Sequence, residues 1–131
     1  MQKRIFLGGT CNNSTWRDSL IPHLNLDYFN PVVEDWTPAC QEQEIIERQN
    51  CDVCLYVITP KMSGVYSIAE VIDDSNKRPD KTVFYFAHKD EDKSFDFGQI
   101  KSLTQVGKMV ETNGAKWCKT YDELLFTLNG N

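Results

Sequence analysis

Three acidic residues, Asp35, Asp52 and Glu70, are the side chains of this sequence best suited to chemistry. Carboxylates act as nucleophiles, general acids or general bases. The sequence has no GxSxG motif and no recognisable Ser–His–acid set. Its two histidines, His23 and His88, lie on a surface-type helix and in a charged loop, so we interpret both as solvated. Any catalysis is therefore predicted to depend on carboxylates.

The sequence lacks the usual signatures of a metal or a cofactor. Cys51 and Cys54 have CxxC spacing but stand at the start of an apolar strand, and we interpret them as buried small apolar residues. Neither GxGxxG nor GxxxxGK[ST] is present. Gly8, Gly9 and Thr10 follow the first strand, where glycine lets a ligand approach the backbone, although a plain tight turn explains them equally well. We expect no metal and no cofactor.

Length and charge limit the partners. A chain of 131 residues has the size of one domain, which we expect to span residues 1–131. The net charge of −5, without a basic cluster, argues against a nucleic acid polymer as the partner. No apolar run reaches the roughly 20 residues of a membrane span, and the short apolar run at 5–7 reads as a strand and not as a signal peptide. We expect a cytoplasmic protein without membrane contact.

Strand-like and helix-like segments alternate along the chain. Apolar runs predict strands at 4–7, 28–29, 53–58, 82–86 and 115–118. Helical spacing and start signals predict helices at 16–24, 38–50, 67–76, 100–113 and 121–128. Pro22 is expected to bend or shorten the first helix, and residues 88–93 are expected to form a charged loop.

This alternation predicts an α/β fold, a flavodoxin-like or Rossmann-like three-layer sandwich. Right-handed crossovers favour a five-stranded parallel sheet with strand order 2-1-3-4-5. Ligands of such sheets bind beyond the carboxyl ends of the strands, where the strand order reverses. The loops at 8–15 and 59–64 face that point, so we expect the site there, with Asp35, Asp52 and Glu70 at or near its rim.

Several segments resemble the nucleoside 2-deoxyribosyltransferases and their relatives. Members of that family carry an Asp before the apolar third strand, then a Gly-containing loop, then a nucleophilic Glu at the start of the next helix. Asp52, Gly64 and Glu70 match this arrangement. The resemblance covers roughly residues 4–88, and its other matching segments are 6–9, 14–17, 29–31 and Trp36.

The resemblance implies cleavage of an N-glycosidic bond in deoxynucleosides or their 5′-monophosphates, as in nucleotide salvage, with transfer to another base or to water. Glu70 would be the nucleophile, and Asp52 would hold the sugar hydroxyls or orient Glu70. The implied substrate-binding residues are Gly8, Gly9, Thr10, Asp35, Gly64, Tyr66 and Ser67. The family also implies a homo-oligomer in which a neighbouring subunit helps to close the pocket. Two carboxylates flanking a sugar suit this chemistry, because they stabilise an oxocarbenium-like transition state.

Other interpretations remain open at this point. Ser67 and Glu70 also have capping-box spacing, and Asp52 could simply cap the entry to its strand. The loop at 60–64 lacks the acid that many relatives place there, and Asp35 is the candidate substitute as proton donor. A non-catalytic nucleotide-binding module of the same fold is the alternative function, and a flavodoxin-like phosphate or flavin binder is a third.

Overall fold

Five parallel strands form the central sheet of the structure, a computed structural model that describes residues 3–11 and 13–130. The order is β2-β1-β3-β4-β7, with every neighbouring pair parallel, which confirms the predicted topology. The strand order reverses at β1, because β2 is added on one side of it and β3 on the other. The carboxyl ends of β1 and β3 therefore flank the reversal point. The strands are β1 (Arg4–Gly9), β2 (Asp27–Phe29), β3 (Val53–Ile58), β4 (Thr82–Phe86) and β7 (Lys116–Cys118).

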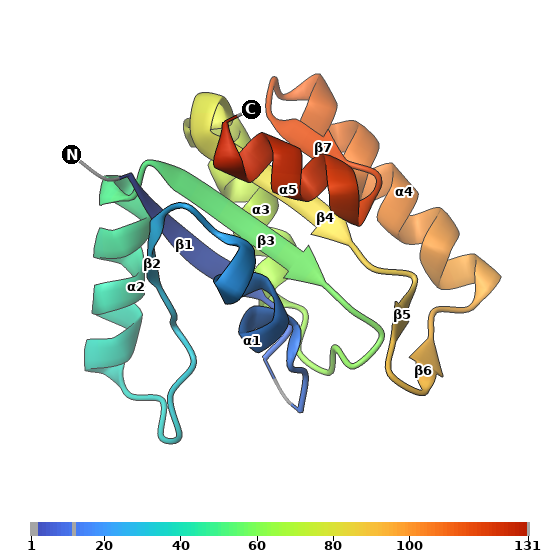
Figure 1. The fold of residues 1–131 in the computed structure, drawn as a ribbon, viewed down its shortest axis with the longest axis horizontal. Helices are drawn as coiled ribbons and strands as arrows, with labels where there is room; N and C mark the ends of the chain where they lie inside the picture. The colour runs from blue at the N-terminus through green and yellow to red at the C-terminus, as the bar shows by residue number, and fades with distance from the viewer. Residues whose placement is uncertain (1–2, 12, 131) are drawn as a thin grey trace.

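Helices cover both faces of this sheet and give the predicted flavodoxin-like three-layer fold. In Figure 1, α1 (Trp16–Leu20) and α5 (Tyr121–Asn129) lie in front of the sheet, and α3 (Tyr66–Lys77) and α4 (Phe97–Thr112) lie behind it. The side chains of α2 (Pro38–Asn50) contact α3. A 3₁₀ turn at Ile21–His23 follows α1, which confirms that Pro22 shortens the first helix. A second 3₁₀ turn, Pro79–Lys81, precedes β4.

Each central strand is apolar on both sides because it is buried on both faces of the sheet. Successive side chains of a strand point to opposite faces, so each strand supplies two cores. One core holds Phe6, Tyr56 and Phe84, and the other holds Leu7, Leu55 and Val83. The sheet is therefore a rigid base for the loops at its carboxyl edge.

One local prediction is wrong. Residues 88–93 contain a small antiparallel hairpin, β5 (Lys89–Asp90) with β6 (Lys93–Ser94), and are not only a loop. In α2, the side chains of Ile45 and Ile46 are exposed, while that of Arg48 is buried. The polar face of α2 therefore packs inward. Within the described part of the chain, none of the helices has the length and apolar content to cross a membrane.

The close approach of β1 to β3 requires glycine at Gly9. Its φ is +122°, and an added Cβ would lie 1.9 Å from the carbonyl oxygen of Val57. We expect Gly9→Ala to lower the free energy of unfolding by about 3 kcal/mol, because it adds backbone strain and a clash inside the sheet.

Urea denaturation measures this effect, and Gly64→Ala is the matched control. No atom lies within 4 Å of a Cβ added at Gly64. That substitution should change stability by less than about 0.5 kcal/mol. Equal effects of the two substitutions would contradict the role of Gly9.

Candidate active site

A cavity of about 1310 Å³ opens at the carboxyl ends of β1 and β3. Pockets for small molecules usually measure about 300–1,000 Å³, so this one is wide enough for a small molecule and open to solvent. Its walls come from the loops after β1, β2 and β3, from α2 and α3, and from the β5–β6 hairpin. Seven of the predicted site residues line it: Gly8, Gly9, Thr10, Gly64, Tyr66, Ser67 and Glu70.

Glu70 lies in the wall of this cavity, one turn into α3. The residue is only 8% exposed. The helix begins at Tyr66 after Val65, and no side chain among the described residues caps its N-terminus. The alternative in which Ser67 and Glu70 form a capping box is therefore wrong. The carboxylate of Glu70 is left to face the cavity and its charged neighbours.

Burial raises the pKa of Glu70 to about 7. The guanidinium of Arg48, whose Nη1 lies 3.6 Å from Oε2 of Glu70, lowers that pKa, and the carboxylate of Glu44 raises it. A carboxyl group with a pKa near 7 exists in both protonation states at neutral pH. It can therefore act as a nucleophile, a base or an acid under physiological conditions.

Arg48 is fixed in place by a buried carboxylate, Asp74, which is fully shielded from solvent. The Nε and Nη2 atoms of Arg48 donate to Asp74 at 3.1 and 3.0 Å. The hydroxyl of Tyr56 donates to the same carboxylate at 2.5 Å, and Arg78 pairs with it from the next turn of α3. Because its Nε and Nη2 donors are held by Asp74 and Asp73, the guanidinium presents Nη1 to Glu70.

The loop after β1 is held by two side chains of the first helix. Arg17, which is buried, donates to the carbonyl oxygens of Leu7 at 2.9 Å and of Thr10 at 2.6 Å. The indole Nε1 of Trp16 also donates to the carbonyl of Thr10, at 2.7 Å. The hydroxyl of Thr10 in turn accepts the backbone N–H of Thr59 at 2.9 Å. These bonds tie the first and third loops together, so this wall of the cavity is rigid.

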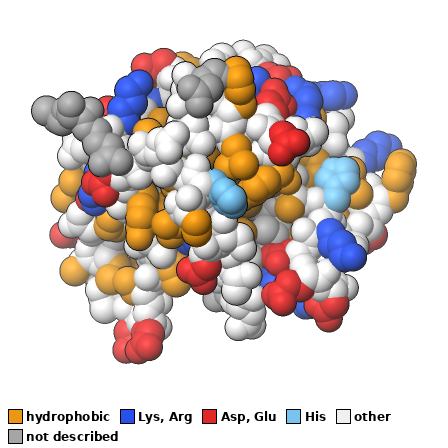
Figure 2. Space-filling view, in the orientation of Figure 1, with side chains coloured by type: hydrophobic (Ala, Val, Ile, Leu, Met, Phe, Trp, Pro, Cys, Tyr) orange, Lys and Arg blue, Asp and Glu red, His pale blue; other side chains and the backbone are white. Residues whose placement is uncertain are grey.

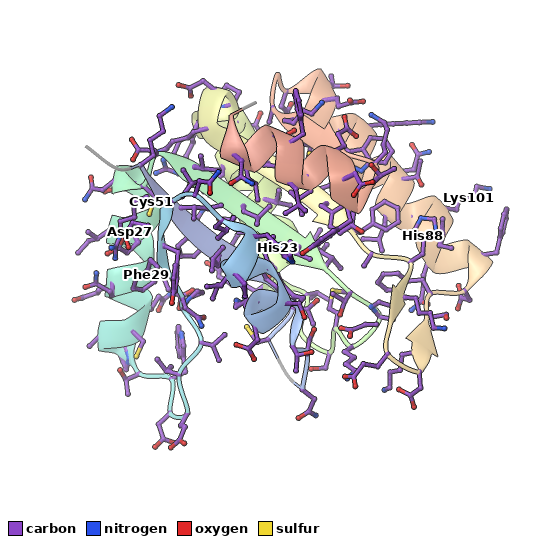
Figure 3. All side chains as sticks on the ribbon, in the orientation of Figure 1. His23, Asp27, Phe29, Cys51, His88 and Lys101 are labelled. Carbon is purple, nitrogen blue, oxygen red and sulfur yellow. The ribbon has the colours of Figure 1, made fainter. Side chains whose placement is uncertain are left out.

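The prediction that Asp52 shares the cavity with Glu70 is wrong. Asp52 precedes β3, whereas Glu70 follows it, and a six-residue strand spans about 20 Å. Its Oδ2 accepts the backbone N–H of Arg4 at 2.9 Å, and its own N–H donates to the carbonyl of Arg4 at 2.8 Å. Its neighbour Cys51 lies at the edge where the strands begin (Figure 3). Asp52 therefore joins the starts of β1 and β3, as the strand-entry alternative stated.

Asp35 is exposed and is not part of the cavity wall. Three carboxylates that the sequence did not single out line the cavity instead, Glu34, Glu44 and Asp92. Oε2 of Glu44 accepts the indole N–H of Trp36 at 2.9 Å, which fixes this carboxylate beside the cavity. Trp36 is 58% exposed and also lines the wall. The spacing of Glu44 and Arg48, one turn apart in α2, was the available sequence signal that both lie on the same face of this helix.

The cavity offers an open space with carboxylates on its walls and no built metal site. Among residues 3–11 and 13–130, no cluster of three or more His, Cys, Asp or Glu side chains could hold a metal ion. Glu70 and Glu44 both line the wall, and the negative charge of Glu44 raises the pKa of Glu70. Such a pair can form a covalent ester and move a proton.

Comparison with known protein families gives a match over residues 2–83, which is more than half of the chain. The matched family is described as nucleoside 2-deoxyribosyltransferase like. No curated protein and no solved structure matches the chain. The matched segment contains β1, β2, β3 and α3, and so includes Glu70 and the loops that line the cavity.

Proposed function

The chain belongs to the nucleoside 2-deoxyribosyltransferase-like family, and on that basis we propose that it cleaves the N-glycosidic bond of deoxynucleosides or their 5′-monophosphates. The deoxyribosyl group is transferred through Glu70 to another base or to water. The observation that carries this proposal is the position of Glu70: a buried carboxylate, without a capping role, in the wall of an open cavity at the carboxyl edge of the sheet.

In the first step of the proposed reaction, ionised Glu70 attacks C1′ of the sugar. The C1′–N bond breaks as the C1′–O bond to the carboxylate forms, and the electron pair of the broken bond goes to the base. A buried carboxylate is suited to this role, because it lies close to the positive charge that develops on the sugar in a medium of low dielectric constant. The product is a glycosyl ester on Glu70 and a free base.

Glu44 serves as the acid and base of the reaction. It takes the place that the sequence had given to Asp35, because it lines the same cavity as Glu70 and is oriented by Trp36. Protonated Glu44 gives its proton to the leaving base. In the second step it takes a proton from water, or from the incoming base, as that acceptor attacks C1′ and releases the carboxylate of Glu70. Atoms and charges balance over the two steps without a further reactant.

A base-release assay tests this function. The protein is incubated with each of the four deoxynucleosides and each 5′-monophosphate, with and without a different free base, and the products are separated by chromatography. Released base, or a new nucleoside when the free base is present, is the expected result. Binding of these compounds without any released or exchanged base would instead support a non-catalytic nucleotide-binding module.

The activity should rise with pH up to about 7. Burial raises the pKa of Glu70 to about 7, and only the ionised carboxylate can attack C1′. With a substrate whose base leaves without a proton from Glu44, kcat/KM is expected to fall about tenfold per pH unit below this value, because the ionised fraction of Glu70 falls tenfold. Initial rates at low substrate concentration between pH 5 and 8 measure the effect. A rate that stays constant over this range would contradict Glu70 as the nucleophile in this environment.

A further inference from the structure

A second hollow, of about 390 Å³, lies on the other face of the sheet, between α1 and α5. It shares none of its lining residues with the cavity around Glu70. Hydrophobic side chains gather between the two histidines in Figure 2, and Figure 3 places His23 at the centre of this face. The hollow lies next to the carboxyl ends of β3 and β4, through Val57 and Tyr85.

The walls of this hollow are largely aromatic and aliphatic. Trp16, Tyr85 and Tyr121 supply the rings, and the two tyrosine rings meet edge to face with centroids 6.2 Å apart. Leu20 and Leu124, both fully buried, close its floor. Rings prefer to pack on other rings in stacked or edge-to-face arrangements. The shape and chemistry of these walls therefore favour a flat aromatic molecule over an aliphatic chain.

Two hydroxyl groups at this hollow lack protein partners in the described part of the chain. The hydroxyls of Tyr85 and Tyr121 have no hydrogen-bond partner among residues 3–11 and 13–130. Ser19, His23 and Thr59 also line the hollow, together with Lys89 and Asp90. The charges of Lys89 and Asp90 cancel, and Asp90 accepts a hydrogen bond from the hydroxyl of Ser14 at 2.6 Å. An apolar pocket with a few convergent polar groups is the usual form of a small-molecule site. The balance of charge indicates a neutral ligand.

We propose that this hollow is a second ligand site, which binds a neutral, planar aromatic compound of one or two rings with a hydrogen-bonding edge. Its volume lies in the usual range for such sites, about 300–1,000 Å³, and suits one such ring system. The ring lies against Trp16 and the two tyrosines, and its polar edge meets their hydroxyls. The inference does not depend on what the first cavity does.

The two sites are in contact through Trp16, which lines the second, and Thr10 and Arg17, which line the first. Trp16, a wall of the second site, donates its indole N–H to the carbonyl of Thr10, a wall of the first. The guanidinium of Arg17, which lines the first cavity, lies 4.3 Å from the centre of the indole ring of Trp16. A ring that stacks on Trp16 therefore alters the surroundings of the Arg17 side chain directly. Occupancy of the second site should be detectable at the edge of the first.

Titration of the ¹⁵N-labelled protein with indole tests the proposal by nuclear magnetic resonance. Indole is neutral and planar, with two rings and one N–H donor. We expect saturable shift changes at the amides of Ser19, Tyr121 and Leu124 and at the side-chain Nε–H of Arg17, with half-saturation below about 1 mM. Changes confined to Gly64, Ser67 and their neighbours would place indole in the first cavity and overturn the proposal.

Two variants of α1 make the test selective. Ser19 is exposed but lines the hollow, so Ser19→Trp fills the space at little cost in stability and should weaken indole binding at least about tenfold. Asp18 is exposed on the same helix and lies outside the lining, so Asp18→Trp should bind indole within about twofold of the unchanged protein. Amide dispersion verifies that both variants are folded.

Equal binding by the two variants, or equal loss in both, would overturn the proposal. So would shift changes at Tyr121 and Leu124 on simple dilution of the protein, because these would assign the hollow to contact with a second copy of the chain.

Discussion

Glu70→Gln is expected to reduce base release by at least about 1,000-fold, because an amide cannot form the glycosyl ester. The substitution keeps the size of the side chain, so the loss measures the chemical role of the carboxylate. Single-turnover assays with a substrate identified by chromatography give the rate. A residual rate within tenfold of the unchanged protein would show that the proposed nucleophile is wrong.

Asp52→Asn is the matched control for this loss. It removes one carboxylate in the same way, but Asp52 lies at the opposite edge of the sheet, where an amide oxygen can still accept the N–H of Arg4. We expect its activity to stay within about twofold of the unchanged protein. A loss comparable to that of Glu70→Gln would contradict the placement of Asp52 away from the chemistry.

Glu70→Gln should also be more stable than the unchanged protein at alkaline pH. The pKa of Glu70 in the folded protein, about 7, exceeds its ordinary value of 4.5, so the folded state favours the protonated carboxyl group. This contribution is complete below pH 4.5 and is lost as the pH rises through 7. At pH 8 the ionised group costs on the order of 3 kcal/mol, which Gln avoids. Urea denaturation at pH 5 and pH 8 should show the gain only at pH 8.

Asp74→Asn is expected to lower the free energy of unfolding by about 3–5 kcal/mol. Asp74 is fully buried and is the main counter-charge of Arg48, and it also accepts from Tyr56 and Arg78. Removal of its charge leaves a buried guanidinium without its main partner, and that imbalance costs more than the original pair contributes. Urea denaturation at pH 7 measures the change.

Asp73→Asn is the control for this second prediction. Asp73 stands next to Asp74 in α3 and also pairs with Arg48, at 3.0 Å, but its side chain is 43% exposed. Solvent screens this pair, so its loss should cost less than about 1 kcal/mol. A similar loss of stability in both variants would show that burial does not set the strength of this network.

Prediction from sequence succeeded where neighbours along the chain settle the outcome. The continuous apolar run at 53–58 identified β3, Thr37 and Pro38 marked the start of α2, and Pro22 ended α1. The strand order followed, because right-handed crossovers leave few arrangements for strands that alternate with helices. The location of Glu70 beyond a buried strand then placed it at the carboxyl edge.

Prediction failed where packing between distant segments decides. In α2, Ile45 and Ile46 are exposed and Arg48 is buried, because Asp74 of α3 supplies the counter-charge of Arg48. The orientation of α2 that buries Arg48 also places Glu44 in the wall of the cavity. No local pattern along 38–50 indicates that α3 carries a buried acid, Asp74, next to Arg48.

The sequence alone determined the layered α/β architecture, the family and the position of Glu70 at the carboxyl edge of the sheet. Hydrophobic periodicity and short motifs are local properties, so these features can be read without the tertiary structure. Only the tertiary structure decided which acids meet. It separated Asp52 from Glu70 by the length of a strand and set Glu44 and Arg48 around Glu70 instead. The physical reason is that charges interact through space, over distances fixed by how helices and strands pack and not by their separation along the chain.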